Sequence, residues 1–64
     1  MSKQWRATRN DGEDLGTFDS RDEAEEAVAA DARHNGEPIH TWKVVFGAAH
    51  AMSRSHTYEV KVAE

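Results

Sequence analysis

A turn sequence and a helix-capping sequence follow each other within residues 5–27, and together they strongly restrict how this part of the chain folds. The run from Asn10 to Gly12 contains residues that tolerate a positive φ, which is typical of a β-hairpin turn. Ser20 and Glu23 form a capping box, the signature of a helix start. We therefore predict a hairpin that leads directly into a helix.

Alternation of apolar and polar residues predicts two strands on each side of this helix. Asn35 and Gly36 end the helix, and Pro38 prevents it from resuming. The last two strands are expected to pair with each other, and residues 47–56 between them are expected to form a long loop. The predicted strands cover residues 3–9, 14–18, 39–46 and 57–63.

These elements predict one α+β domain over residues 1–64, in the order ββαββ. The simplest assembly is a four-stranded antiparallel sheet with the helix packed on one face. For the strand over residues 14–18 the buried face stays open, since Leu15 and Phe18 point to opposite sides. On the other strands, alternation assigns these apolar residues to the helix-covered face: Trp5, Trp42, Val44, Phe46, Tyr58, Val60 and Val62.

Charge is distributed unevenly along the chain. Residues 11–37 carry ten acidic residues against two arginines, whereas residues 1–10 carry three basic residues and no acidic one. The net charge of −4 disfavours a general nucleic-acid binder, because phosphate neutralisation supplies most non-specific affinity. A locally basic face of the sheet could still bind nucleic acid, which therefore stays an alternative partner.

Several function classes are disfavoured by what the sequence lacks. There is no cysteine, which excludes disulfides and thiolate zinc sites and favours a reducing compartment, the cytoplasm. No apolar run approaches the roughly 20 residues of a membrane span, so no membrane partner is expected. The spacing of the four histidines matches no zinc pattern, and we expect neither a metal nor another cofactor.

A hydrolytic site is also disfavoured. Ser53, Ser55 and His56 are a conceivable nucleophile and base, but the sequence shows no residue that would orient them. A chain this small would lack a pocket of ordinary size. We therefore expect that the protein is not an enzyme.

Three groups of residues are candidates for binding. The uncovered face of the sheet is expected to present basic and hydroxyl side chains, the long loop presents a second group, and the helix presents carboxylates. The sheet-face group is Arg6, Thr8, Arg9, Lys43 and Lys61; the loop group is His50, Met52 and Arg54; the helix group is Asp22, Glu25 and Glu26.

The sequence Leu-Gly-Thr-Phe at residues 15–18, followed by Ser20 and Glu23, resembles the ethylene-response-factor type of DNA-binding domain. Similar hairpin–helix units occur at the N-termini of phage integrases, and the chain also resembles small bacterial and phage ββαββ proteins. The resemblance covers residues 5 to about 30. It implies that Arg6, Thr8 and Arg9 face DNA. The first strand of that family has no counterpart here, and its members lack the second hairpin.

These observations favour a small non-enzymatic binding or regulatory module that acts through protein–protein contacts. Such a module would be phage-encoded or accessory, and the exposed strand edges make a homodimer one form of the contact. The alternative is a DNA-binding protein that uses the open face of the sheet. A second alternative is an inhibitor whose acidic helix mimics nucleic acid.

Overall fold

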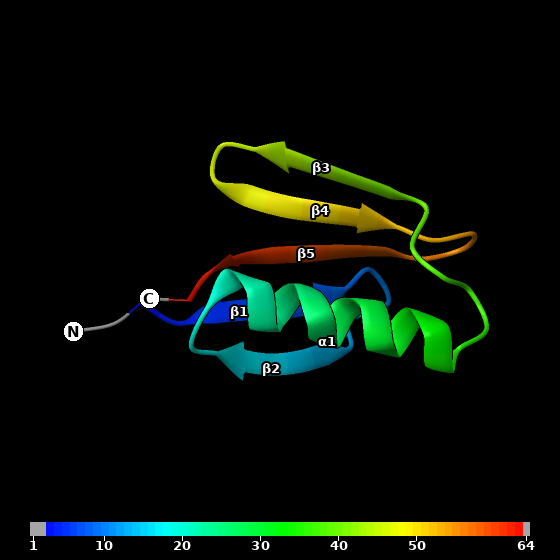
Figure 1. The fold of residues 1–64 in the computed structure, drawn as a ribbon, viewed down its shortest axis with the longest axis horizontal. Helices are drawn as coiled ribbons and strands as arrows, with labels where there is room; N and C mark the ends of the chain where they lie inside the picture. Colours follow the sequence, from blue (N-terminus) through cyan, green and yellow to red (C-terminus); the bar gives the residue numbers. More distant parts are fainter. Residues whose placement is uncertain (1–2, 64) are drawn as a thin grey trace.

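The computed structural model describes residues 3–63 and shows an α+β fold in which one helix covers part of a five-stranded antiparallel sheet (Figure 1). The sheet order is β2-β1-β5-β4-β3, so the last strand of the chain lies at the centre. The predicted class and the helix on one face are confirmed. The predicted count of four strands is wrong. The elements are β1 (Trp5–Arg9), β2 (Asp14–Phe18), α1 (Arg21–His34), β3 (Thr41–Val45), β4 (Ala48–Met52) and β5 (Thr57–Val62).

The first hairpin and the helix start form as local sequence dictates. The turn is closed by a hydrogen bond from the Arg9 N–H to the Glu13 carbonyl (2.8 Å), and Gly12 adopts a φ of 94°. Ser20 is the N-cap of α1, where its hydroxyl oxygen accepts a hydrogen bond from the Glu23 N–H at 3.1 Å. The predicted hairpin–helix unit is confirmed.

A β-bulge in β2 settles which face of this strand is buried. Ala7 is paired with Gly16 and Thr8 with Asp14, so Leu15 has no partner in β1. Gly16 adopts a φ of 108°, which a residue with a side chain rarely takes. Because of this extra residue, both Leu15 and Phe18 pack against the core.

The core is thin and consists mostly of small side chains. Among the described residues, Val28 and Val60 are the largest side chains that are fully buried. Alanines at the helix–sheet contact allow α1 to approach the strands closely. The buried hydrophobic residues are Ala7, Ala24, Val28, Ala32, Ala49, Ala51, Tyr58 and Val60.

The predicted loop over residues 47–56 is wrong, because most of it forms β4. Phe46 and Gly47 have φ values of 52° and 79° and connect β3 to β4 in a two-residue turn. A second tight turn joins β4 to β5, with the Ser53 N–H donating to the His56 carbonyl at 2.9 Å. Strands β3 and β5 are therefore separated by β4 and are not paired with each other.

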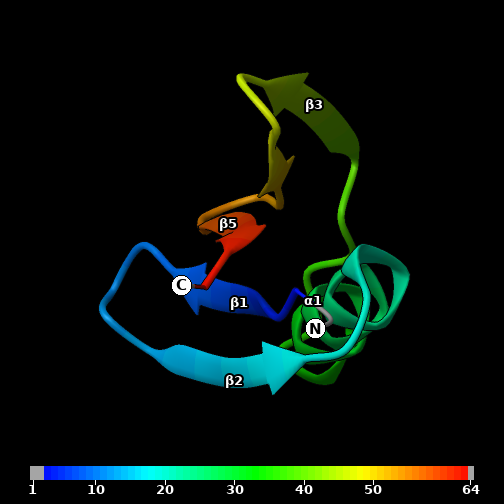
Figure 2. The same cartoon turned by 90° about the vertical axis from the view of Figure 1, so that its left-hand side faces the viewer.

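The prediction that Trp42, Val44 and Phe46 belong to the covered core is also wrong. Trp42 and Val44 are 42% and 59% exposed, and Phe46 is fully exposed. The reason is the reach of the helix, which packs on β1, β2 and β5, whereas the β3–β4 hairpin continues the sheet beyond it (Figure 2). The sheet is wider than one helix covers.

Candidate binding surfaces

The outer edge of β3 presents backbone groups that no other strand uses. The Ser53 N–H donates to the His56 carbonyl, and this pair continues the register of β4 with β5. Backbone groups of alternate residues point to the same side of a strand, so those of Ala51 also point toward β5. Trp42 is paired with Ala51 across the β3–β4 ladder. Its N–H and C=O, like those of Val44, therefore point away from β4, toward the open edge.

The side chains of β3 divide between the two faces of the sheet. Trp42 is paired with Ala51 and Val44 with Ala49, and these four side chains lie on the same face of the sheet, where both alanines are buried. Lys43 lies on the opposite face. No ion pair of residues 3–63 involves Lys43. The edge thus combines an apolar side with an uncompensated ammonium group on the other side.

Phe46 stands at the tip of the β3–β4 hairpin in a strained conformation. Its φ of 52° is in the left-handed region, which costs a residue with a side chain about 1–2 kcal/mol. Hairpin turns of this kind favour Asn-Gly, not Phe-Gly. Neither burial nor turn preference explains an aromatic residue at this position, and such conflicts concentrate at functional sites.

The charge of this region is opposite to that of the helix. Residues 38–58 contain Lys43, Arg54 and three histidines but no acidic residue, whereas residues 11–37 contain ten acidic residues. The β3–β4 hairpin therefore lacks the negative charge that surrounds the helix.

The open face of the sheet brings together the predicted side chains Arg6, Thr8, Lys43 and Lys61. Arg6 is directly paired with Lys61, and both line a shallow depression of about 560 Å³. The charges are partly compensated, because Arg6 lies 3.5 Å from Asp14 and Lys61 lies 3.6 Å from Glu59. The structure thus places four of the five predicted sheet-face residues on one surface that is only mildly basic.

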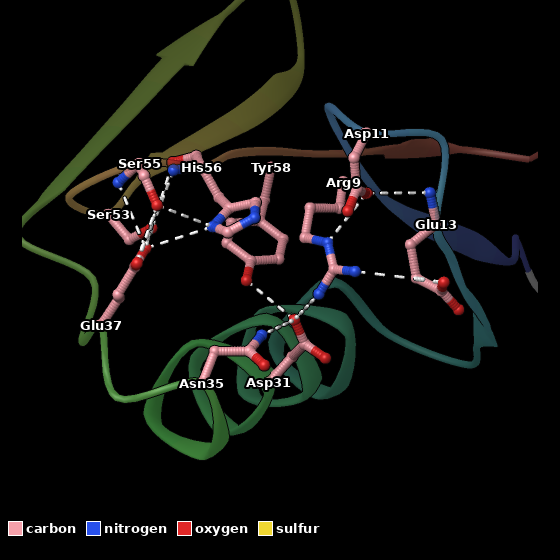
Figure 3. A network of polar contacts seen from close by, with 10 residues as sticks. All are labelled: Arg9, Asp11, Glu13, Asp31, Asn35, Glu37, Ser53, Ser55, His56 and Tyr58. Carbon is pink, nitrogen blue, oxygen red and sulfur yellow. Dashed lines mark hydrogen bonds and ion pairs between the residues drawn. The ribbon is translucent and has the colours of Figure 1, made fainter.

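Arg9 does not join this face. Its guanidinium group contacts Asp11 and Asp31, each at 2.9 Å, and Asp31 also accepts hydrogen bonds from the Tyr58 hydroxyl (2.7 Å) and the Asn35 amide (3.2 Å) (Figure 3). The hydrogen bond from Arg9 lowers the pKa of Asp11. Burial, followed by the contact with Asp31, raises the pKa of Tyr58. Arg9 thus connects the first hairpin to α1.

Glu37 gathers the polar residues of the β4–β5 turn. The Ser55 hydroxyl lies 2.7 Å from both Glu37 carboxylate oxygens, and the Ser55 N–H donates to one of them at 3.2 Å. His56 Nδ1 lies 3.1 Å from the same carboxylate. The Ser53 hydroxyl also donates to the Glu37 carboxylate, at 3.4 Å. These contacts, with Ser55 first and His56 next, lower the pKa of Glu37 to about 2. Nothing in the sequence spacing indicates Glu37, since its partners follow 16 to 19 residues later.

This cluster does not have the geometry of a Ser-His-acid relay. Such a relay uses one imidazole nitrogen for the serine and the other for the acid. Here His56 Nδ1 lies near both Ser55 (3.3 Å) and Glu37 (3.1 Å). The cluster instead ties the segment that follows α1 to the turn that precedes β5 (Figure 3).

The structure separates the predicted loop group. His50 and Met52 lie on β4, on the open face, and His50 is paired with Lys43, whereas Arg54 is exposed in the turn after β4. The predicted helix group stays on α1: Asp22 and Glu26 are exposed, and Glu25 lies 3.3 Å from Arg21.

Within residues 3–63, no three His, Cys, Asp or Glu side chains gather closely enough to hold a metal ion. The helix of this part of the chain is too short and too polar to cross a membrane.

Comparison of the chain with models of protein families, with curated proteins and with solved structures found no match.

Proposed function

We propose that this protein is a non-enzymatic binding module that receives a partner polypeptide along the open edge of β3. The observation that carries the proposal is the edge itself, where the outward backbone groups of Trp42 and Val44 lie beside their exposed apolar side chains. Strand addition uses such an edge: main-chain hydrogen bonds supply affinity, and alternate side chains supply specificity.

The two edges of the sheet differ in how they are protected. At the other edge, β2 carries a bulge, and the Asp14 carboxylate accepts a hydrogen bond from the Gly16 N–H at 2.8 Å. Bulges of this kind are a common way to block edge pairing. β3 has no bulge in its register with β4, and four large apolar side chains along β3 and in the turn after it are exposed: Trp42, Val44, Val45 and Phe46. An edge left open in this way favours a binding role.

The aromatic residues of the hairpin strengthen this interpretation. Trp and other aromatic side chains supply much of the energy of protein–protein interfaces when they are desolvated by a partner. Trp42 lies on β3, and Phe46 lies at its end, where its strained φ brings no packing in return. A partner that covers both side chains would offset this strain.

The proposal is tested by affinity capture from the native host, with nuclease treatment and mass spectrometry. The bait is the full chain, as wild type, as Val44→Pro and as Val44→Thr. Proline removes the outward N–H of Val44, which takes no part in the β3–β4 ladder, and fixes φ at about −65°, whereas threonine keeps the N–H and the strand propensity. We expect a nuclease-resistant protein that Val44→Thr retains and Val44→Pro loses, with both variants equally folded by circular dichroism. Retention by Val44→Pro contradicts the proposal.

DNA binding is the second candidate, because Arg6, Thr8, Lys43 and Lys61 share the uncovered face of the sheet. This function predicts binding that weakens with salt and with Arg6→Glu and Lys43→Glu. Titration of DNA at low salt, followed through the backbone amide signals, tests it. Unchanged signals on the open face contradict this candidate.

A further inference from the structure

The side chains and backbone of β3 also define which sequence fits beside it. Resting on the proposed function, we infer that the partner is an extended segment of another protein with the pattern apolar–acidic–apolar, added to β3 as an antiparallel strand. Three features of the edge carry this inference: the direction of its backbone groups, the face of each side chain and the lack of an ion-pair partner for Lys43 among the described residues.

The two apolar positions follow from Trp42 and Val44. Their backbone groups point outward, so each forms a hydrogen-bonded pair with the partner residue directly opposite. Residues that are directly opposite share a face of the sheet. The two partner residues therefore lie beside Trp42 and Val44, which are 42% and 59% exposed without a partner. Apolar side chains at both positions would cover this surface.

The acidic position follows from Lys43. Its backbone groups point toward β4, so the partner residue opposite forms a non-hydrogen-bonded pair, in which the Cα atoms approach to about 4.5 Å. Lys43 has no ion-pair partner in the described part of the chain, and its neighbour on β4 is His50, which in turn is paired with Glu59 of β5. An acidic side chain on the added strand would complement Lys43.

A second copy of this chain fits the same edge poorly. A two-fold axis at Lys43 would set this residue against its own copy, and like charges directly opposite each other are destabilising. An axis at Val44 would need Phe46 in an extended conformation, but its φ is 52°. An axis at Trp42 would need the His40 N–H at the edge, but this group donates to the Met52 carbonyl (3.0 Å). The edge therefore favours a different chain.

The test titrates capped nine-residue peptides into the ¹⁵N-labelled full chain. One peptide carries Val-Glu-Val between threonine and serine flanks, and its match carries Val-Lys-Val. We expect saturable shifts of the amides of β3 with Val-Glu-Val and an affinity about three- to tenfold weaker with Val-Lys-Val at low salt. Lys43→Glu should reverse this order. Lys61→Glu, the same charge change on the same face of β5, should leave the order unchanged.

N-methylated peptides test the backbone hydrogen bonds of strand addition separately from the side-chain pattern. A methyl group on the backbone nitrogen of either valine blocks a hydrogen bond to β3 and should abolish binding, whereas on the glutamate it points away from β3 and should be tolerated. If Val-Glu-Val binds at β3 but valine methylation has no effect, strand addition and the proposed function both fail. If β3 responds to neither peptide, the sequence pattern fails, and affinity capture with Val44→Pro still tests the proposed function.

Two other outcomes overturn only the sequence pattern or the choice of partner. Sensitivity to valine methylation with equal affinity for both peptides contradicts the acidic position and leaves strand addition standing. Shifts of the β3 amides with protein concentration alone, without peptide, show that a second copy occupies the edge.

Discussion

The two halves of the sheet use similar residues in opposite ways. In the half formed by β2, β1 and β5, the helix covers the apolar face, and Val28 and Val60 are fully buried. In the β3–β4 hairpin, Val44 lies on the same face of the sheet but is 59% exposed. The difference lies in coverage and not in the pattern of the strands. A single helix packs on three strands, β4 still buries Ala49 and Ala51, and β3 extends an apolar surface to the solvent.

The halves also differ in charge. Acidic residues concentrate in residues 11–37, around the helix, while residues 38–58 carry none. Acidic residues in the first turn of α1 stabilise the helix through its dipole, so they have a structural reason to be there. Lys43, the one lysine of the β3–β4 hairpin, takes part in no ion pair of the described residues. This contrast suggests that the first half supports the structure and the second half supports binding.

The same substitution made in both halves tests whether they differ in burial. Val28→Ala should lower the free energy of unfolding by about 2–3 kcal/mol, because it leaves a cavity in a fully buried site. Val44→Ala should lower it by about 0.5 kcal/mol or less, since exposed positions tolerate truncation. Urea denaturation measures both. Equal losses would show that the hairpin is as much part of the core as the helix.

The contacts of Asp31 allow the covered half to be tested more finely. Tyr58→Phe removes the hydroxyl that lies 2.7 Å from the Asp31 carboxylate and should cost about 1–2 kcal/mol, since this bond joins β5 to α1 and one partner is charged. Asn35→Ala removes the more exposed contact at 3.2 Å and should cost less. A larger loss with Asn35→Ala in thermal unfolding would place the important contact at the end of the helix and not at the sheet.

The tip of the hairpin should respond in the opposite direction. Phe46→Asn is expected to raise stability by about 1 kcal/mol, because asparagine tolerates the positive φ that phenylalanine adopts at a cost. Phe46→Leu keeps a branched apolar side chain at the same φ and serves as the control, with no gain expected. Loss of stability in Phe46→Asn would mean that the aromatic ring packs on the hairpin in solution.

The first half of the fold was predictable because its signals are local. The turn at Asn10 to Gly12 and the capping box at Ser20 depend on residues that are close in sequence, and the structure contains both. The strand β4 was missed because its sequence, Ala-Ala-His-Ala-Met, lacks the β-branched and aromatic residues typical of strands. It forms a strand because β3 and β5 pair with it on both sides.

The candidate site was only partly predictable for the same reason. Alternation correctly placed Arg6, Thr8, Lys43 and Lys61 on one face of the sheet. It also placed Trp42 on the other face, but alternation does not reveal whether a helix reaches that far across the sheet. The exposed edge follows from the order of the strands, and the insertion of β4 between β3 and β5 decides that order.

Glu37 lies where the two halves meet and gives the finest test of how they are joined. Its contacts with Ser55 and His56 hold its pKa at about 2, below the usual 4.5. A carboxylate with a lowered pKa contributes stability that is present above pH 4.5 and is lost as the pH falls toward 2. Glu37→Gln should therefore flatten the loss of stability across this window.

In Ser55→Ala, carboxyl ¹³C titration should show the pKa of Glu37 rising toward its usual value. Ser53→Ala, whose hydroxyl lies at 3.4 Å, should raise it less. An unchanged pKa in Ser55→Ala would mean that the Ser55 hydroxyl does not hold the Glu37 carboxylate in solution, and the contact between the turn and the segment after α1 would then rest on the Ser55 N–H, His56 and Ser53.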